Sequence, residues 1–572
     1  MKYFIPEWDD RVDPNYNFIT DTHSREHKKD PIRNDVYTWD IFGLSNAPLD
    51  GVLVSRIVIM QNKKKYEWAR KEGIHKVLRL PEEFEIIGDC GAFGYVKEKI
   101  PPYDPIETLK YYHDLGFNYG VSVDHMVVPQ FEKDKDFRMR LTFENGVKSF
   151  EYWSRNYKKD FQLIVSVQGL NITDYLDMYD DYLKHGITYL GFGGLARSPT
   201  NYILQLLDKL VKRTKETKII PEYLHFFGLA RFSLFPKFRE LEELGVEVGF
   251  DSVSFLRKAW LASPTAQLNY ISLSGKGYTA IRIPFVGRKK KKKNEASLVK
   301  VKSEDLVKLE QECLQKLRMY DKRETDLETV LKILSRFNKS IGGQPELMKY
   351  YRKTLEEKPW KLCDCPICRS IGIEVVIFRG NNRNRRRGFH NTYIFYKVLK
   401  NPELWPKFIN KESIVEKTDL TKLSRNEKVL VITGCTKKKL GNDESVKAPA
   451  KQMYQGRLFK TVRKYCETMG FDYVIISAKY GLIRPDEEIS GYEKVLKTKE
   501  DVEKIQPLVE EKLKPIIQNY DKILVIAGKR YREVLKNLWN EKFITIQAKG
   551  YADLCNKVKK IIPKKTLLEF IV

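Results

Sequence analysis

The residues with the clearest chemistry are four side chains of metal-ligand type in one segment. Cys363, Cys365 and Cys368 form a tight cluster, and His390 follows 22 residues after the last of them. Three thiolates and one imidazole make a complete tetrahedral set for Zn²⁺, so no coordination position remains for water. The spacing therefore predicts one tightly held, structural zinc ion per chain rather than a catalytic one. Buried free cysteines are the alternative, which so tight a cluster disfavours.

A second set of chemically useful residues follows short β-rich runs in the first half of the chain. Its members are Asp89, Asp124, Gln168, Gly193, Gly228 and Asp251. Paired carboxylates can divide nucleophilic and proton-transfer work between them. Any one of these residues is also an ordinary turn former or helix cap, but six at strand ends indicate a shared site.

The elements that would position these residues alternate between strand and helix. The predicted strands are 52–59, 85–89, 119–124, 162–168, 187–193, 223–228, 246–251 and 278–283. Eight strands alternating with helical segments predict a (β/α)₈ TIM barrel, an α/β fold whose active sites lie at the carboxyl ends of the strands. The six residues above would then share one face of the barrel.

Composition sets the class of protein and of partner. The chain has 572 residues, 42% of them hydrophobic and 31% charged, with a net charge of +27. The hydrophobic fraction excludes a disordered chain, and the length predicts two or three domains. The positive charge favours a nucleic-acid partner over a merely basic surface. There is neither a long apolar run nor a signal-like start, which predicts a cytoplasmic protein without a membrane partner.

The predicted domains are a barrel over 1–345, a zinc-binding subdomain over 346–410, a linker over 411–426 and a C-terminal three-layer α/β domain over 427–572. A basic and helical stretch at about 288–340 is interpreted as a solvated insertion, with a phosphate-binding strip as the alternative. A second basic run is predicted to contact a nucleic-acid backbone, because guanidinium groups suit phosphate oxygens. Its residues are Arg383, Arg385, Arg386 and Arg387.

These motifs resemble the tRNA-guanine transglycosylase superfamily, in which a Cys-x-Cys-x-x-Cys and distant His subdomain accompanies a (β/α)₈ barrel. The segment from Asp89 to Phe93 resembles the family's general acid/base motif, and Phe250-Asp251-Ser-Val resembles its nucleophile motif. The resemblance covers about residues 40 to 400. It implies exchange of one base for another at C1′, with Asp251 as nucleophile and Asp89 as acid/base, through a covalent aspartyl-glycosyl intermediate.

The same resemblance implies the residues that bind the base. Asp124 would accept hydrogen bonds from guanine N1 and N2, while Gln168 and the backbone of Gly193, Gly194 and Leu195 would read O6 and a 7-substituent. Phe93 and Phe227, the latter just before Gly228, take positions where the family sandwiches the purine. Each phenylalanine alone fits a core role as well.

The N-terminal stretch is similar to the DpdA branch, which installs 7-deazaguanines such as preQ0 in DNA. Its residues are 3–14 and 20–23. Asp251 is followed by Ser-Val-Ser-Phe-Leu-Arg rather than the Pro-Thr-Arg of bacterial tRNA enzymes. The resemblance therefore favours DNA, reached by flipping the target nucleotide. A tRNA substrate and a non-catalytic nucleic-acid-binding relative are the alternatives, and a homodimer or partner proteins are left open.

The C-terminal part resembles a small α/β domain of unassigned function in phage and bacterial proteins. The residues that carry this resemblance are 429–439, 448–450, 475–481 and 523–529. Its strands end in small-residue turns with a nearby lysine, which could cradle a phosphate or a nucleotide. Cys435 after the first strand is interpreted as a buried residue rather than a nucleophile.

Overall fold

The protein is described from a computed structural model. It covers residues 1–217, 219–260, 268–286, 303–409, 428–441, 443–539, 542–546 and 551–561. The chain divides into two compact units, Met1–Ser413 and Ile414–Val572. The predicted linker and the basic run at 288–293 lie outside the described residues.

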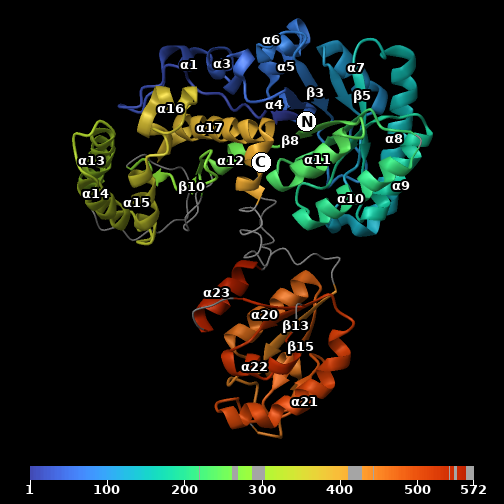
Figure 1. Ribbon diagram of the computed structural model, residues 1–572, viewed down its shortest axis with the longest axis vertical. Coiled ribbons are helices and arrows are strands. Elements are labelled where there is room, and N and C mark those ends of the chain that lie inside the picture. Colours follow the sequence, from blue (N-terminus) through green and yellow to red (C-terminus); the bar gives the residue numbers. More distant parts are fainter. Residues whose placement is uncertain are drawn as a thin grey trace. The chain divides into compact units, whose positions relative to one another are not determined.

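The first unit is built on a closed, eight-stranded parallel barrel, which confirms the predicted fold class (Figure 1). Its strands are β1 (Lys2–Pro6), β2 (Gly51–Ser55), β3 (Glu85–Asp89), β4 (Tyr119–Val121), β5 (Gln162–Val167), β6 (Tyr189–Phe192), β7 (Tyr223–Phe226) and β8 (Glu247–Asp251).

One predicted strand is wrong. The segment 278–283 is not in the barrel but belongs to the short strands β10 (Gly277–Tyr278) and β11 (Ile281–Arg282). The missing strand is β1, whose Tyr3 pairs with Phe250 of β8 and whose Phe4 pairs with Gly51 of β2. Five residues at the start of the chain therefore close the barrel.

Alternating side chains fill the barrel and its surrounding layer. Phe4, Leu53, Ile87, Val121, Ile164 and Tyr223 pack inside it. The outward positions of the strands pack against the helices, as expected for strands buried on both sides. The covering helices are α4 (Arg56–Gln61), α5 (Lys63–Glu72), α6 (Ile74–Leu78), α7 (Pro105–Leu115), α8 (Lys135–Asn156), α9 (Ile172–Lys184), α10 (Thr200–Glu216) and α11 (Phe235–Glu242).

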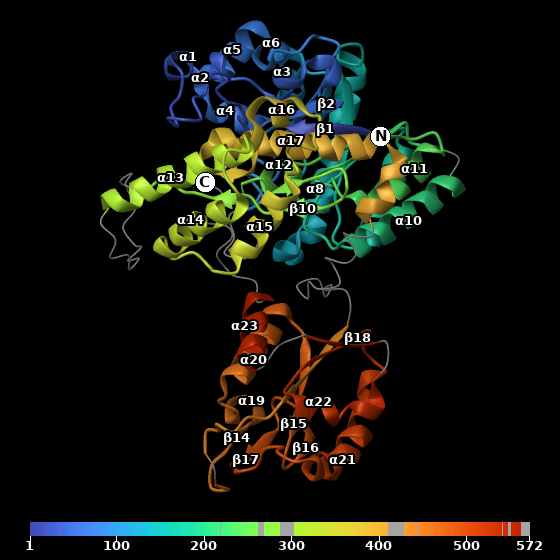
Figure 2. The same cartoon turned by 60° about the vertical axis from the view of Figure 1, so that its left-hand side comes forward.

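The long β1–β2 connection carries α1 (Arg25–Lys29), α2 (Pro31–Asn34) and α3 (Thr38–Phe42). After β8 come α12 (Ser254–Lys258), β9 (Tyr270–Ile271), α13 (Ser303–Asp321), α14 (Leu327–Ser340), α15 (Leu347–Glu357), α16 (Pro366–Ile371), β12 (Ile377–Phe378) and α17 (Gly380–Lys400). Figure 2 shows α13, α14 and α15 side by side next to the barrel.

Helices α13 and α14 share a hydrophobic core with the cysteine cluster. Leu314 and Leu334 are buried in the same core as Cys365 and Cys368. The interpretation of this stretch as a solvated insertion is therefore wrong for Ser303–Ser340, because its apolar faces complete the metal-binding part of the unit. Helix α17 packs on both sides, with Phe389 in this core and Phe395 in the barrel core.

The second unit is a three-layer α/β domain. Its five-stranded sheet has the order β16-β15-β13-β18-β19, formed by Gly481–Ile483, Asp472–Ser477, Val429–Gly434, Lys522–Ile526 and Phe543–Thr545. Residues of α20 (Arg457–Met469) and α23 (Tyr551–Ile561) form one core, and those of α21 (Lys499–Ile517) form the other. The smaller elements are β14 (Lys447–Pro449), α19 (Ala450–Met453), β17 (Glu488–Ser490) and α22 (Lys529–Glu533).

Across the described ranges of both units, none of the helices has the length and apolar character needed to cross a membrane.

Candidate active site and metal centre

Asp251 ends strand β8, and its carboxylate is held by two donors. The Gly228 N–H lies 3.0 Å from Oδ1, and His225 Nε2 lies 3.2 Å from the same oxygen. Gly228 has a φ of +74°, a left-handed conformation that suits glycine, and a Cβ there would meet Ala196 at 2.8 Å. The turn after β7 thus delivers a backbone donor to Asp251 and leaves no room for a side chain.

His225 is a site residue that sequence reasoning missed. Its side chain is fully buried, and its Nδ1 lies 2.9 Å from the hydroxyl of Tyr223. The Asp251 carboxylate can only accept a hydrogen bond, so Nε2 carries the imidazole hydrogen and donates to it. With that hydrogen on Nε2, Nδ1 accepts the Tyr223 hydroxyl, whose pKa burial raises well above its ordinary value. Tyr223 and His225 alternate along β7, and Phe227 continues the alternation just after the strand, which was the available signal for an inward-facing histidine.

We expect His225→Phe to lower kcat of any reaction that uses the Asp251 carboxylate by about 10- to 100-fold while leaving KM for the substrate unchanged, because a hydrogen bond to a charged group contributes about 1.5–3 kcal/mol. His225→Gln keeps an N–H donor and should restore much of the loss. Steady-state kinetics of both variants measures this. Equal loss in both variants would show that His225 acts only through packing.

Asp89 ends strand β3 beside the same barrel mouth. Its Oδ2 accepts the Gly91 N–H at 3.0 Å, and Ser55 pairs with it in the neighbouring strand. Burial, together with the nearby carboxylates of Asp124 and Asp251, raises the pKa of the Asp89 carboxyl to about 7, although the hydrogen bonds from Gly91 and Ser55 oppose the shift. Asp89 can therefore give up or take a proton near neutral pH.

Asp124 and Gln168 form a direct hydrogen bond through their side chains. Gln168 Nε2 donates to Asp124 Oδ2 at 2.5 Å, and the Cys90 thiol donates to Oδ1 at 3.2 Å. Both side chains are buried, and burial raises the pKa of Asp124 although these two hydrogen bonds oppose the shift. A carboxylate with spare acceptor capacity at the barrel mouth can accept further N–H donors.

The backbone at Gly193 and Gly194, just after β6, packs closely against the Gln168 side chain. A Cβ on Gly193 would lie 2.2 Å from Gln168 Nε2, and one on Gly194, whose φ is +76°, would lie 3.0 Å from Gln168 Oε1. The Gly193 carbonyl accepts the hydroxyl of Tyr175 at 2.8 Å. Leu195 is buried in the barrel core, so only its backbone is available to a ligand.

The two predicted stacking residues differ in exposure. Phe93 is 47% exposed, with the guanidinium of Arg197 5.6 Å from its ring centroid. Phe227 is half-buried, 4.6 Å from the His225 ring and close to the backbone of Gly191. An exposed ring and a half-buried ring beside His225 could each face a planar ligand.

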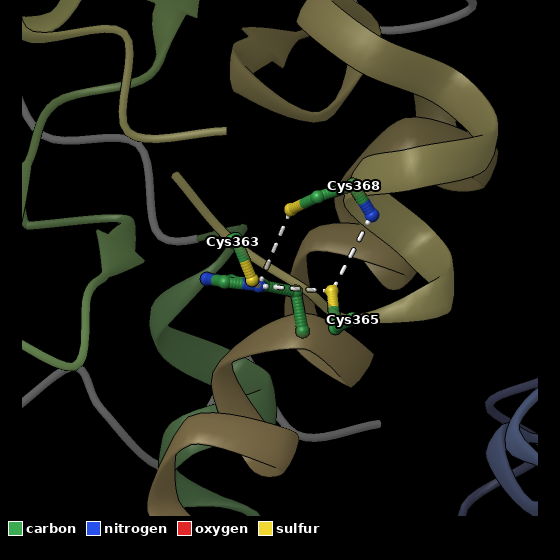
Figure 3. Close-up of side chains that lie close together, drawn as sticks. Cys363, Cys365 and Cys368 are labelled. Atoms are coloured by element: carbon green, nitrogen blue, oxygen red, sulfur yellow. Dashed lines mark hydrogen bonds between the residues drawn. The ribbon is translucent and has the colours of Figure 1, made fainter. Parts of the chain in front are cut away.

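The metal-ligand residues converge as the sequence predicts (Figure 3). Sγ of Cys363, Cys365 and Cys368 lie 3.5, 3.4 and 3.5 Å from Nδ1 of His390. Thiolates at about 2.3 Å and an imidazole nitrogen at about 2.0 Å from a tetrahedral zinc ion would be about 3.5 Å apart. The donor set and its spacing therefore fit a closed zinc site.

Residues around the cluster fix the orientation of the histidine. His390 Nε2 lies 2.8 Å from the Ile271 carbonyl oxygen, which leaves Nδ1 for the metal. The Tyr270 ring stacks on the imidazole with a centroid distance of 3.9 Å, and its hydroxyl lies 3.3 Å from Cys368 Sγ. These contacts join β9, α16 and α17 at one point.

The prediction that Arg383, Arg386 and Arg387 contact a nucleic acid is wrong, because all three side chains are buried. Arg383 pairs with Asp21 and with Glu374, the latter at 2.6 Å. Arg387 donates to backbone carbonyls of Ala259, Val375 and Ile377.

The remaining members of the run also bind the chain itself. Arg386 donates to the Asp13 carbonyl at 2.8 Å, and the half-buried Arg385 donates to the Arg11 carbonyl at 2.6 Å. The arginines of α17 thus satisfy acidic groups and loop carbonyls that would otherwise be buried without partners.

Comparison with known proteins covers both units. The chain is 31% identical over 423 residues to the DNA-guanine transglycosylase of Salmonella montevideo. The aligned region covers 70% of this chain and 97% of the relative. Residues 429–550 match a family of unknown function, DUF6884. The chain is also 28% identical over 118 residues to the uncharacterized protein YfjM of Bacillus subtilis (strain 168), or 20% of this chain and 79% of that protein.

Proposed function

The chain belongs to the DNA-guanine transglycosylase family and is a pentosyltransferase, and we propose that it exchanges guanine in DNA for a 7-deazaguanine such as preQ0 through a covalent aspartyl-glycosyl intermediate. The observation that carries the mechanism is the contrast between two carboxylates at one barrel mouth. Asp251 is held by two N–H donors, whereas Asp89 has a pKa raised to about 7. One is suited to attack and the other to proton transfer.

In the first half-reaction, Asp251 attacks C1′ of the target nucleotide as the bond from C1′ to guanine breaks. Protonated Asp89 gives its proton to the leaving base, so guanine departs neutral. The Gly228 N–H and His225 Nε2 fix the attacking carboxylate in one orientation. The products are an aspartyl-glycosyl ester, free guanine and an ionised Asp89.

In the second half-reaction, Asp89 takes the proton from the incoming base, whose nitrogen attacks C1′ and releases the Asp251 carboxylate. Asp89 is then protonated again, and the phosphodiester backbone is never cut. A group that donates in one step and accepts in the next works best with a pKa near the working pH, which matches the raised pKa of Asp89.

The pH dependence follows from that shift. The proton that Asp89 donates is present below pH 7 and is lost as the pH rises through about 7. We expect kcat/KM for guanine release to fall about tenfold per pH unit above that point. A pH–rate profile from pH 5.5 to 9 measures this. In the Asp89→Asn variant, the fall in kcat/KM above pH 7 should be absent. A flat profile across pH 7 in the unmodified enzyme would contradict the assignment.

In this proposal the base is recognised by the hydrogen-bonded pair of Asp124 and Gln168 and by the backbone at Gly193 and Gly194. Asp124 would accept N1–H and N2–H of guanine, donors that a 7-deazaguanine shares. Gln168 and the backbone at Gly193 to Leu195 would lie toward O6 and position 7. A Cβ at Gly193 would clash with Gln168, so a residue other than glycine there would displace the Gln168 side chain.

Access to the site requires the nucleotide to leave the duplex stack or to be single-stranded. Phe93 and Phe227 would then hold the extruded purine, one from the exposed side and one from the wall beside His225. The net charge of +27 supports a polyanionic substrate. The zinc ion would be held by Cys363, Cys365, Cys368 and His390 and would supply structural rigidity without entering the reaction.

A chase experiment tests the nature of the incoming base. DNA labelled enzymatically with radioactive guanine is incubated with excess unlabelled preQ0, and retained label is counted. We expect loss of label and appearance of the deazaguanosine in digested DNA by mass spectrometry. Chase by guanine alone, with none by preQ0, would contradict the 7-deazaguanine assignment.

A further inference from the structure

A second cluster of metal-ligand side chains lies in the β1–β2 connection, away from the four cysteine and histidine ligands described above. Asp13, His23 and His27 each place one ligand atom so that all three atoms lie within 4.8 Å of one another. The Asp13 side chain is fully buried, while the two imidazoles are partly exposed. This cluster contains no thiol and takes no part in the mechanism proposed above.

The three side chains lie close enough to share one ion. His23 Nδ1 lies 3.2 Å from Asp13 Oδ2, and the rings of His23 and His27 stack with centroids 3.6 Å apart and an interplanar angle of 14°. Two ligand atoms bound to the same zinc-like ion at about 2.0–2.2 Å lie about 3.0–3.6 Å apart. The two rings are nearly parallel, so one imidazole must rotate about its Cβ–Cγ bond for both in-plane lone pairs to point at the same ion.

The surroundings orient the ligands. His27 Nδ1 lies 2.8 and 3.0 Å from the two carboxylate oxygens of Asp35, so it donates there and leaves the Nε2 lone pair available. A carboxylate behind a histidine is the usual outer partner of a metal-bound imidazole. Asp13 is fixed by the Ser24 N–H at 2.7 Å and the Ser24 hydroxyl at 2.9 Å.

We propose that Asp13, His23 and His27 bind one divalent ion of the zinc class, with at least one coordination position open to water. Two neutral imidazoles and one carboxylate suit zinc or a similar borderline ion better than calcium or magnesium. The ion closes the loop from Asp13 to His23. That loop contains Asp21, the partner of the buried Arg379 and Arg383. The site therefore fastens the N-terminal connection against α17.

Metal stoichiometry tests the proposal on the full-length protein. After equilibration with a zinc buffer and gel filtration, the unmodified chain should hold two zinc ions by inductively coupled plasma mass spectrometry. His23→Gln and His27→Gln should each hold one, the Cys₃His ion, which also reports that the variants are folded. His113→Gln is the matched control, because His113 is an exposed histidine 3.0 Å from Asp114 and should leave two ions in place.

Cobalt binding to the unmodified chain gives a readout that does not depend on the variants folding. Protein dialysed against a chelator keeps the Cys₃His zinc, and titration with Co²⁺ should then load one equivalent without the intense thiolate-to-cobalt absorption. No bound cobalt, or two zinc ions retained in both histidine variants, would overturn the proposal and leave the cluster as hydrogen-bonded Asp and His residues.

Discussion

Asp251→Asn should abolish both base exchange and the covalent protein–nucleic acid adduct, with a fall in rate of at least about 10³-fold, because a carboxamide cannot serve as the nucleophile. The variant should fold, since the asparagine Oδ1 can still accept the Gly228 N–H and the His225 Nε2–H. Exchange of labelled guanine measures the rate, and a denaturing gel detects the adduct.

The matched variant is Asp89→Ala, which removes the proton donor but keeps the nucleophile. It should slow turnover while still permitting an adduct. The presence of the adduct, and not the rate alone, therefore distinguishes the role of Asp89 from that of Asp251. Near-normal exchange by Asp251→Asn would rule out its role as nucleophile.

Cys365→Ser should have the second largest effect, this time on stability. Cys365 is fully buried in the core that joins α13, α14 and α16, so losing the thiolate removes the metal and leaves a polar group in that core. Structural zinc contributes on the order of 10 kcal/mol to the folding of small zinc domains, and a large fraction of that should be lost here. Metal analysis should show loss of the zinc that otherwise resists dialysis against a chelator, and thermal unfolding should occur far earlier.

Cys313→Ser is the control, because Cys313 is buried in the same core but is not among the four metal ligands. It should keep the chelator-resistant zinc and lose much less stability. A Cys365→Ser protein with full zinc content and unchanged unfolding temperature would contradict the zinc assignment.

Much of the site could be read from the sequence because its residues stand at strand ends or in tight ligand spacing. Asp89 and Asp251 end strands of the barrel, and Asp124 and Gln168 are bonded to each other across neighbouring strands. Periodicity and strand-end position fix these placements locally, so no long-range information was needed.

The remaining features depend on contacts between distant segments. Strand β1 is recognisable only through its pairing with β2 and β8, whereas 278–283 has strand-like composition but no barrel neighbour. The arginines of α17 look like a phosphate-binding strip until Asp21 and Glu374 are placed beside them. A charge run shows how many cations a segment has, not whether their partners lie elsewhere in the chain.

Guanine exchange in DNA at this barrel can be measured by supplying the unmodified protein with radiolabelled guanine and either DNA or tRNA. DNA duplexes, single strands and total tRNA should be matched in guanine content and assayed side by side, with Asp251→Asn as the blank. We predict incorporation into DNA that depends on Asp251, and none into tRNA. Incorporation into tRNA with none into duplex or single-stranded DNA would show that the substrate is tRNA and not DNA.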